Sequence, residues 1–387
     1  MALPLTYNFR NVLVRWRATL ATILGIGLVV AVFVLVQSLA IGLEKSAGNT
    51  GDPRNLMIVR KGSTAESTSQ VSLAQFQIIR YWEQIAHDAA GTPLVSADVV
   101  TLISQPRRDG RGEANVSVRG LTPVGMILRP QVKLLTGRWF IPGKRELIVS
   151  RKIARRFAGF QVGESFRTAG STLTVVGEFD GSNSAFDSEL WMDADEARSL
   201  FDRQNYSSLL VRAANPEASR EIINRIESDK RLPLLAEPEV KYYGDQTATA
   251  LPIKILGNFL ATAMSIGAVF AAMNTMYARV GSRTREIGTL RVLGFRRRTI
   301  LAGFILEGAL LAAIGGILGC LLALPLHGVS TGTMSFNSFS ETVFEFRITP
   351  WLAVKGITFA IVVGVIGSLL PAIRASRLPV IAALKSL

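Results

Sequence analysis

Four long stretches of the sequence are almost free of charge, and they limit the fold more than any other feature. The four are Ala18–Leu43, Ile255–Ala278, Thr299–Leu326, which contains only Glu307, and Gly356–Ile373. About 20 apolar residues in a helix cross the roughly 30 Å hydrocarbon core of a bilayer. The last stretch reaches this length if it extends outward over Trp351–Val354, past Lys355, whose long side chain can reach the interface. Because lipid offers the backbone no partners, we expect four transmembrane helices.

The first apolar stretch has an alternative interpretation. Arg10, Arg15 and Arg17 precede it and the small residues Ser38–Ala40 lie near its end, as in a cleavable signal peptide. The apolar part of a signal peptide is usually about 7–15 residues long, and this stretch is much longer. We therefore expect an uncleaved helix.

The distribution of charge predicts the orientation. Residues 1–17, the loop Arg279–Arg298 and the tail after Ile373 together carry 13 cations and one anion, whereas residues 44–250 carry 27 cations and 25 anions. Lysine and arginine accumulate in cytoplasmic loops. We expect a multi-pass protein of the cell (inner) membrane with both termini and the 279–298 loop in the cytoplasm. Residues 44–250 and the loop 327–350 are then outside.

The predicted fold is a membrane α-helical protein with a mixed α+β extracytoplasmic domain inserted between helices 1 and 2. Short β-branched runs predict strands at Asn55–Arg60, Asn115–Gly120, Glu146–Val149 and Thr172–Glu178. Apolar spacing predicts helices at Leu73–Ala89, Pro216–Ser228 and Asp193–Phe201, with Asp193 as the cap of the last. The predicted segments are 1–17, 18–43, 44–250, 251–278, 279–298, 299–326, 327–350, 351–373 and 374–387.

Motifs for catalysis and metal binding are weak. Gly137–Lys144 has phosphate-loop character with the wrong spacing, so a turn between strands is favoured. Gly328–Gly332 fits the G-x-S-x-G pattern around Ser330, but it follows a membrane span in a loop of small residues. The only histidines, His87 and His327, lie in different segments, and the single cysteine, Cys320, lies inside the third span. We therefore expect no catalytic, cofactor-binding or metal-binding residue. No basic stripe interleaved with aromatic residues indicates nucleic acid.

Glu307 is the most informative acid, because an ionisable group in a span usually faces protein or water. Two interpretations stay open: hydration near the inner interface, or a hydrogen bond across the bundle, for example to Asn274 on the second span. Gly315 and Gly319 on the same helix form a G-x-x-x-G pair, which permits close approach of another backbone.

The cytoplasmic loop holds the strongest local pattern. Ile287, Leu290 and Leu293 recur at every third position and predict an apolar ridge on a short helix surrounded by arginines, with Gly294 as its cap. The alternative is a basic loop bound to anionic membrane lipid. Lipid binding alone does not explain so regular a ridge. We assign the interface with a partner protein to Arg283, Glu286, Ile287, Leu290, Arg291, Leu293, Gly294 and Arg297.

This loop, with Glu307 following, resembles the hallmark of permease subunits of the FtsX/MacB-like (type VII) ABC transporter superfamily. The closing run Pro371–Pro379 and the entry into the first helix, Asn11–Ile26, resemble the same family. Val118–Gly120, Leu135–Phe140, Val162–Gly163 and Val175–Gly177 resemble its MacB-type extracytoplasmic domain. One departure is the tail after Pro379, which lacks the acid that the family usually places there.

The resemblance implies a non-catalytic permease subunit, whose ATP and Mg²⁺ are bound by a separate ABC ATP-binding subunit. The short cytoplasmic helix would lie in a cleft of that subunit. The resemblance also implies a second permease copy, identical or a paralogue, and it allows an extracytoplasmic adaptor. Closure of the ATPase pair would move the external domain through the first two spans, for export or mechanotransmission.

Two other function classes remain open from the sequence. A membrane-anchored receptor or scaffold would bind a ligand through its external domain and would need no partner at the cytoplasmic loop. A membrane-anchored hydrolase would use Ser330 as its nucleophile, and replacement of Ser330 by alanine would abolish its activity.

Overall fold

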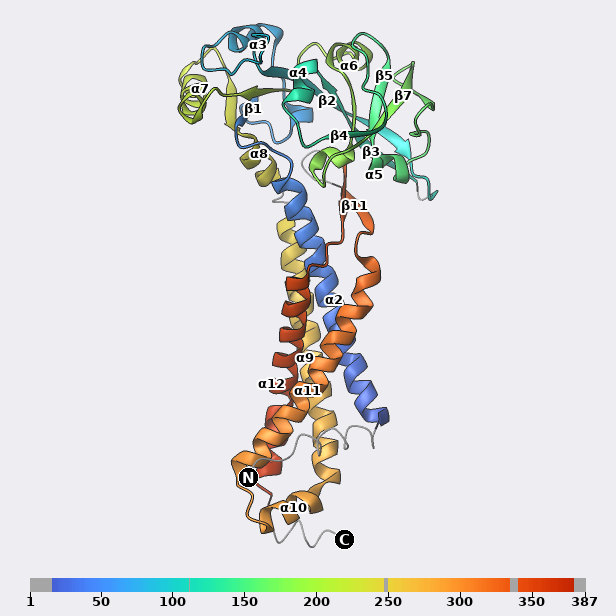
Figure 1. Cartoon of the computed structure of the whole chain (residues 1–387), viewed down its shortest axis with the longest axis vertical. Coiled ribbons are helices and arrows are strands. Elements are labelled where there is room, and N and C mark those ends of the chain that lie inside the picture. The colour runs from blue at the N-terminus through green and yellow to red at the C-terminus, as the bar shows by residue number, and fades with distance from the viewer. Residues whose placement is uncertain (1–15, 111, 247–249, 335–339, 379–387) are drawn as a thin grey trace. The chain divides into compact units, whose positions relative to one another are not determined.

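The computed structural model describes residues 16–110, 112–246, 250–334 and 340–378 (Figure 1). The described residues form two compact units. The helical unit takes the chain up to Ile41, Pro252–Val329 and the chain from Phe346, and the sheet unit takes Gly42–Leu251 and Ser330–Glu345.

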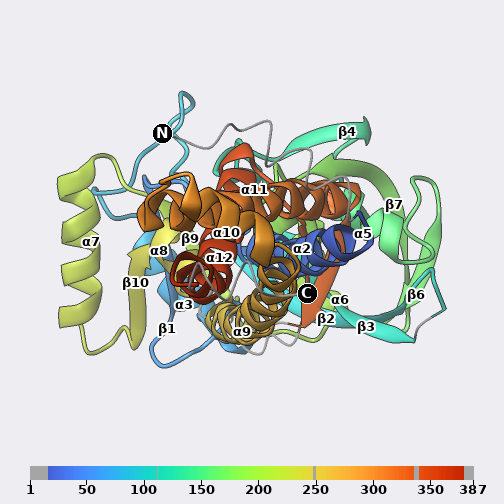
Figure 2. The same ribbon diagram turned by 90° about the horizontal axis from the view of Figure 1, so that it is seen from below.

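The helical unit is built on four long helices, α2 (Trp16–Gly48), α9 (Ala250–Ser282), α11 (Arg297–Ala323) and α12 (Pro350–Ser376). A short helix α10 (Thr284–Val292) lies between α9 and α11, and a 3-10 turn η4 (Leu324–Leu326) follows α11. Within the described residues, these four helices are long and apolar enough to cross a membrane, in agreement with the predicted number of spans. Seen from below, they lie together as one bundle (Figure 2).

Glycines let the four helices approach closely. A Cβ atom on Gly319 would lie 2.5 Å from the carbonyl oxygen of Gly27 in α2, and one on Gly315 would lie 3.0 Å from that of Ile23. Two turns earlier in α11, a Cβ on Gly308 would lie 2.6 Å from the Cβ of Ser368 in α12. In lipid, the hydrophobic effect does not drive helices together. Small residues at the contacts instead let the backbones approach closely, and the helices then gain dispersion contacts. Gly315 and Gly319 thus lie where α11 packs on α2.

The sheet unit contains a ten-stranded sheet in the order β10-β1-β9-β2-β3-β8-β5-β7-β4, with β6 paired to β7. The strands are β1 (Asn55–Arg60), β2 (Val95–Pro106), β3 (Glu113–Leu121), β4 (Lys133–Gly137), β5 (Glu146–Ser150), β6 (Ser165–Thr168), β7 (Ser171–Asp180), β8 (Glu189–Asp193), β9 (Ser208–Arg212) and β10 (Leu234–Pro238). The pairs β3–β8 and β5–β7 are parallel and the other pairs are antiparallel.

Both faces of the sheet are buried. Along β1, Leu56 and Ile58 belong to one apolar cluster, whereas Met57 and Val59 belong to the other. This explains why β1 reads as a continuous apolar run, since a strand covered on both faces has no solvent side. The covering helices are α3 (Leu73–Arg80), α4 (Pro123–Ile127), α5 (Arg151–Arg156), α6 (Ala194–Leu200), α7 (Pro216–Ser228) and α8 (Glu239–Gln246), with 3-10 turns η1 (Glu66–Thr68) and η2 (Ala185–Ser188).

Most of the predicted elements of this unit are present. β1 and α7 have the predicted bounds, and Asp193 caps α6 by accepting a hydrogen bond from the Glu196 amide at 3.2 Å. The predicted helix Leu73–Ala89 is wrong beyond Arg80. The chain after Arg80 instead pairs with the end of β9, since the Ala86 amide donates to the Arg212 carbonyl at 2.9 Å. His87 consequently forms a bridge with Pro93 and is not helical.

The predicted outer loop 327–350 contains a hairpin that belongs to the sheet unit. Its strands are β11 (Ser330–Met334) and β12 (Glu341–Glu345). Val343 is fully buried in the core of the sheet unit, and its amide donates to the Ser188 hydroxyl at 2.8 Å. Ser330 therefore begins a strand that is followed by another strand. A nucleophile elbow requires a helix after the serine, so the structural context that the hydrolase alternative requires is not present at Ser330.

Candidate functional site

The short helix α10 is formed by local signals at both of its ends. Gly294 adopts φ +88°, a conformation that costs other residues steric strain, and it reverses the chain directly after the helix. The Phe295 amide donates to the Leu290 carbonyl at 3.1 Å, which satisfies one of the free carbonyls of the last turn. Gly294 thus acts as the turn that the sequence predicted.

The predicted apolar ridge on α10 is divided between two environments. Ile287 is 2% exposed and packs in a cluster with Met276 of α9, Phe304 of α11 and Ala372 of α12. Leu290 is partly buried. Leu293 is 69% exposed and its neighbour Val292 is 61% exposed. The ridge is therefore not one free surface, because Ile287 attaches α10 to the bundle and the exposed apolar end is formed by Val292 and Leu293.

Glu307 of α11 is buried between two arginines. Its Oε1 accepts a hydrogen bond from Arg279 Nη1 at 2.8 Å, and its Oε2 accepts one from Arg283 Nη1 at 3.0 Å. Arg279 Nη2 also donates to the Thr19 hydroxyl of α2 at 2.6 Å. The side chain of Glu307 is 2% exposed and that of Arg279 is 5% exposed. We call these four residues the Glu307 cluster, and it joins α2, α9, α11 and the first residue before α10.

The Glu307 cluster corrects three predictions. Hydration of Glu307 is wrong, because its side chain is buried. A bond across the bundle is right in kind, but its partner is not Asn274, which is exposed on another face of α9. Arg283 is ion-paired inside the bundle and 9% exposed, so it does not lie on a free docking face. A buried carboxylate needs a cation in low dielectric, and Arg279 and Arg283 are the cations in reach.

The remaining residues assigned to the interface are distributed along α10 and the start of α11. Glu286 and Arg297 are exposed, and Arg291 is partly buried. Val292 and Leu293 form an exposed apolar tip, which Arg291 directly precedes in the chain, whereas Glu286 lies in the first turn of α10. Arg279, Thr19 and Val292 were not among the site residues predicted from the sequence. The spacing of Arg279 and Arg283, one helical turn apart and near a lone intramembrane acid, is the signal that could have identified the cluster.

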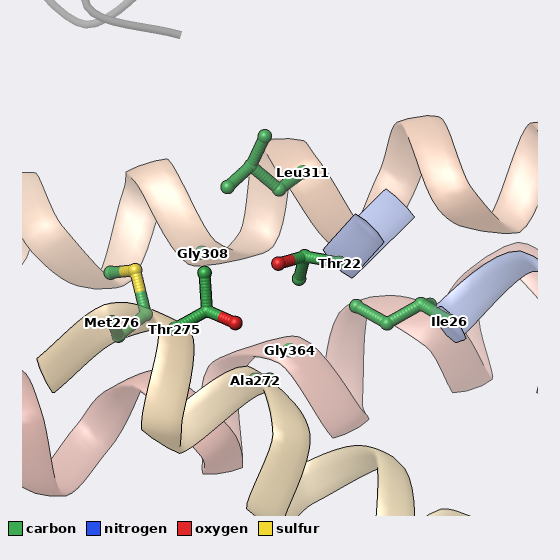
Figure 3. Close-up of a pocket in the computed structure, with 8 residues that line it drawn as sticks. All are labelled: Thr22, Ile26, Ala272, Thr275, Met276, Gly308, Leu311 and Gly364. Atoms are coloured by element: carbon green, nitrogen blue, oxygen red, sulfur yellow. The ribbon is translucent and has the colours of Figure 1, made fainter. Parts of the chain in front are cut away.

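A small cavity lies among the four long helices, and Gly308, one of its lining residues, directly follows Glu307 in α11 (Figure 3). It has a volume of about 10 Å³ and is lined by Thr22, Ile26, Ala272, Thr275, Met276, Gly308, Leu311 and Gly364. This is room for one water at most. The described helices are therefore closely packed around this cavity.

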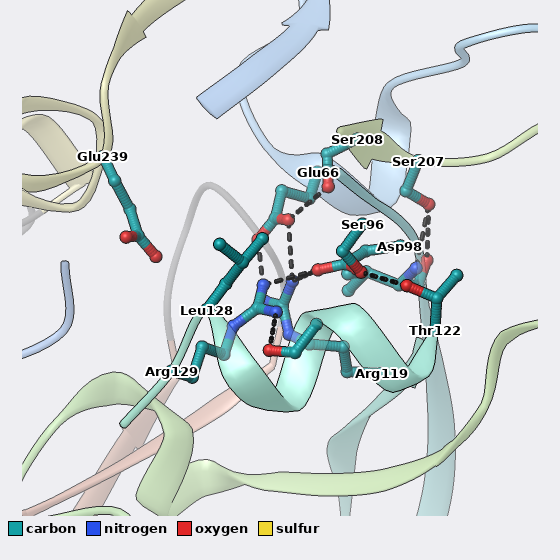
Figure 4. A network of polar contacts seen from close by, with 12 residues as sticks. Glu66, Ser96, Asp98, Arg119, Thr122, Leu128, Arg129, Ser207, Ser208 and Glu239 are labelled. Atoms are coloured by element: carbon teal, nitrogen blue, oxygen red, sulfur yellow. Dashed lines mark hydrogen bonds and ion pairs between the residues drawn. The ribbon is translucent and has the colours of Figure 1, made fainter. Parts of the chain in front are cut away.

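A second buried polar network lies in the sheet unit (Figure 4). Arg119 of β3 donates to both carboxylate oxygens of Glu66, at 2.8 and 2.7 Å, and to both of Glu189, at 2.8 and 2.7 Å. Arg129 is ion-paired with Asp98, which also lies 3.4 Å from Arg119. Burial alone would raise the pKa of Glu66, but the charge and hydrogen bonds of Arg119 lower that pKa to about 2. The network connects neighbouring strands of the sheet and is fully buried. We therefore expect it to contribute to the stability of the folded sheet unit.

Two family models match the sequence. The MacB-like periplasmic core domain matches residues 18–229, which is more than half of the chain, and the FtsX-like permease C-terminal domain matches residues 258–380. The chain belongs to the MacB/FtsX family of ABC transporter permeases. It is a membrane protein with an extracytoplasmic domain.

Individual relatives agree with this assignment. An uncharacterized ABC transporter permease, YknZ of Bacillus subtilis, is 24% identical over 98% of this chain and 96% of its own length. The macrolide export ATP-binding/permease protein MacB of Pasteurella multocida is 24% identical over 94% of this chain, but only 57% of its own length. MacB of Nitrobacter winogradskyi is 38% identical over 34% of this chain and 19% of its own length. The permease thus spans only part of the MacB relatives, whose names include an ATP-binding function.

Among solved structures, the extracellular domain of YknZ from Gram-positive bacteria covers 47% of the permease at 15% identity, with a TM-score of 0.35. The periplasmic region of MacB from Actinobacillus actinomycetemcomitans covers 49% at 11% identity, with a TM-score of 0.37. The family models place the Glu307 cluster mainly in the FtsX-like part of the permease, and only Thr19 falls within the MacB-like match.

Proposed function

We propose that this permease is a subunit that couples ATP hydrolysis by a separate ATP-binding subunit to a conformational change of its extracytoplasmic domain. The domain is inserted between the first two spans, and the tip of α10 docks on the ATPase. ATP and Mg²⁺ are bound by that partner chain. The work done outside is export or mechanotransmission, in an assembly with a second permease copy and, where the system has one, an extracytoplasmic adaptor.

One observation supports this proposal most: α10 combines an exposed apolar tip with a firm attachment to the bundle. Val292 and Leu293 are exposed on it, while Ile287 and Arg283 at its other end are buried. A tip that only bound lipid would need no ion pair to hold the helix. A helix that receives force from a partner does need one, because a loose attachment would absorb the movement.

The proposed orientation places both termini and α10 in the cytoplasm. It follows from the 13 cations and one anion on those three segments. A reporter that is active only in the cytoplasm should work when inserted near Phe295 and should be inactive when inserted near Gly181. Activity of the reporter inserted near Gly181 would contradict the proposed orientation.

The docking of α10 is tested by replacing Leu293 with aspartate. If Leu293 is buried in a groove of the ATPase, a charge there is left unpaired and co-purification should fall at least tenfold. Leu290→Asp should also weaken the complex, but part of its effect falls on the fold because Leu290 is partly buried. Val162→Asp is the matched control, since Val162 is 44% exposed in the sheet unit.

The outcome separates the permease from a receptor or scaffold. Loss of the ATPase in Leu293→Asp, with normal insertion and an intact complex for Val162→Asp, supports the permease. An ATPase that co-purifies equally with both variants, or that never co-purifies with the wild-type chain, favours a receptor that works without this partner.

A further inference from the structure

A basic cleft lies on the sheet unit, and it shares no residue with the Glu307 cluster or the α10 tip. Its volume is about 330 Å³, and it is lined by Arg107, Arg108, Asp109, Arg155 and Arg156. Two segments contribute the arginines: the turn between β2 and β3, and the last turn of α5. Neither the family assignment nor the proposed function gives this cleft a role.

Backbone contacts hold the two segments together. The Arg108 amide donates to the Arg156 carbonyl at 2.8 Å, and Arg107 forms a β-bridge with Phe157. The Arg108 guanidinium donates to the Ala154 carbonyl at 3.2 Å, at the end of α5. A helix C-terminus favours nearby cations, which accounts for arginines on α5 itself. It does not account for two more arginines brought to the same place from a different hairpin.

The cleft keeps an excess of positive charge. Glu341 of β12, with 3% of its side chain exposed, pairs with Arg107 at 2.7 Å and also with Arg156. Asp109 is the other acid at the cleft. Four arginines against these two acids leave two positive charges. Arg155 is exposed, and the Nε of Arg156 is buried without an acceptor among the described residues.

We propose that this cleft binds a phosphate group, and that the bound phosphate competes with Glu341 for Arg107 and Arg156. The guanidinium group presents paired N–H donors that match phosphate oxygens, and a phosphate dianion balances an excess of two charges. Glu341 already shows that Arg107 and Arg156 can share one oxyanion.

Competition with Glu341 would connect the cleft to the membrane helices. Glu341 lies on the hairpin β11–β12, whose two strands continue in the chain to α11 and α12. A phosphate that displaces Glu341 therefore loosens the hairpin, while the Val343–Ser188 hydrogen bond still retains it. By linkage, any movement that pulls Glu341 away from the arginines would increase the affinity for phosphate.

The test uses the full chain in nanodiscs of phosphatidylcholine, titrated with pyrophosphate by calorimetry. Arg155→Ala should weaken binding about fivefold, since it removes one charge-assisted contact without disturbing an internal pair. Glu341→Gln should tighten binding about fivefold, because it removes the charge of the competitor. Arg167→Ala is the matched control: Arg167 is an exposed arginine of β6 that does not line the cleft, and its loss should change nothing.

A second arm separates a free phosphate from a lipid headgroup. The same chain is placed in nanodiscs that contain phosphatidic acid, and hydrogen exchange is measured at the amides of β12. A lipid ligand should speed exchange at residues 341–345 in the wild type and not in Arg155→Ala. A free phosphate should bind in the first arm and leave exchange unchanged in the second.

Either pattern supports the phosphate site and shows whether its ligand is a free phosphate or a lipid headgroup. Two results overturn the proposal. One is an absence of both pyrophosphate binding and a lipid effect in the wild-type chain. The other is binding that Arg155→Ala changes no more than Arg167→Ala does. Weaker phosphate binding by Glu341→Gln would contradict the proposed competition, because the Glu341 carboxylate would then be assisting the binding of the ligand.

Discussion

Among the described residues of the permease, a buried charge cluster in the sheet unit and one in the helical unit differ in what they join. In the sheet unit, Arg119 and Arg129 lie among Glu66, Asp98 and Glu189, on strands and a 3-10 turn of one continuous core. In the helical unit, Glu307 alone holds Arg279 and Arg283, from separate helical segments. The first network is surrounded on all sides and fixes a core. The second is a small link between separate helical segments, so the two clusters should respond differently to mutation.

The largest effect is expected from Arg119→Met. It leaves Glu66 and Glu189 buried without their common partner, which should lower the unfolding free energy of the sheet unit by about 3–5 kcal/mol. The measurement is thermal unfolding of the full chain in detergent, followed by near-UV circular dichroism. Arg138→Met is the control, because the Arg138 side chain is 49% exposed and loss of its pair with Glu146 should barely move the midpoint. Equal unfolding midpoints for the two variants would mean that the buried Arg119 network contributes no more to stability than the Arg138–Glu146 pair.

Acid is expected to have the second-largest effect, by lowering the unfolding free energy of the sheet unit. The pKa of Glu66 is lowered to about 2 in the folded protein, so its contribution is complete above the unfolded value of about 4.5 and is lost as pH falls from there. Protonation of this one group should cost about 3 kcal/mol between pH 5 and pH 2. The unfolding midpoint of the wild type should therefore fall more steeply with acid than that of Glu66→Gln. Parallel pH curves for the two proteins would contradict this.

A smaller effect is expected from Glu307→Lys. It places a third cation beside Arg279 and Arg283, which should destabilise the helical unit on the order of 2 kcal/mol and reduce accumulation in the membrane. Glu307→Gln keeps a hydrogen-bond acceptor and should retain most of the protein. Glu286→Lys is the control, since Glu286 is exposed on α10. Normal accumulation of Glu307→Lys would show that the link is dispensable for assembly.

The sequence predicts the helical unit well and the sheet unit only in part. Four uncharged stretches suffice to give the four spans, because lipid imposes one solution on the backbone. β1 and α7 were predictable from local pattern. The hairpin β11–β12 was not, because Glu341 and Val343 are held by Arg107 and Ser188, which lie more than 150 residues away in the chain. Local propensity carries no information about such contacts.

The candidate site shows the same limit. The apolar positions Ile287, Leu290 and Leu293 gave the helix α10 and Gly294 gave its end, but spacing alone could not show that Ile287 faces the bundle. The partner of Glu307 was also misassigned. Asn274 is polar and lies within the apolar stretch, whereas a buried carboxylate is satisfied by a cation, and Arg279 lies just past the end of that stretch at Ala278.

The central claim is that α10 receives force from an ATPase and passes it to the helices through the Glu307 cluster. Glu307→Gln tests it most directly, because the substitution weakens the link and leaves the exposed tip of α10 intact. The measurement is made on one preparation, as affinity for the ATP-binding subunit and as permease-stimulated ATP hydrolysis. The account predicts affinity within about twofold of wild type and stimulation reduced about tenfold, a loss of roughly 1.4 kcal/mol in coupling. Unchanged stimulation, or a parallel loss of affinity and stimulation, would contradict it.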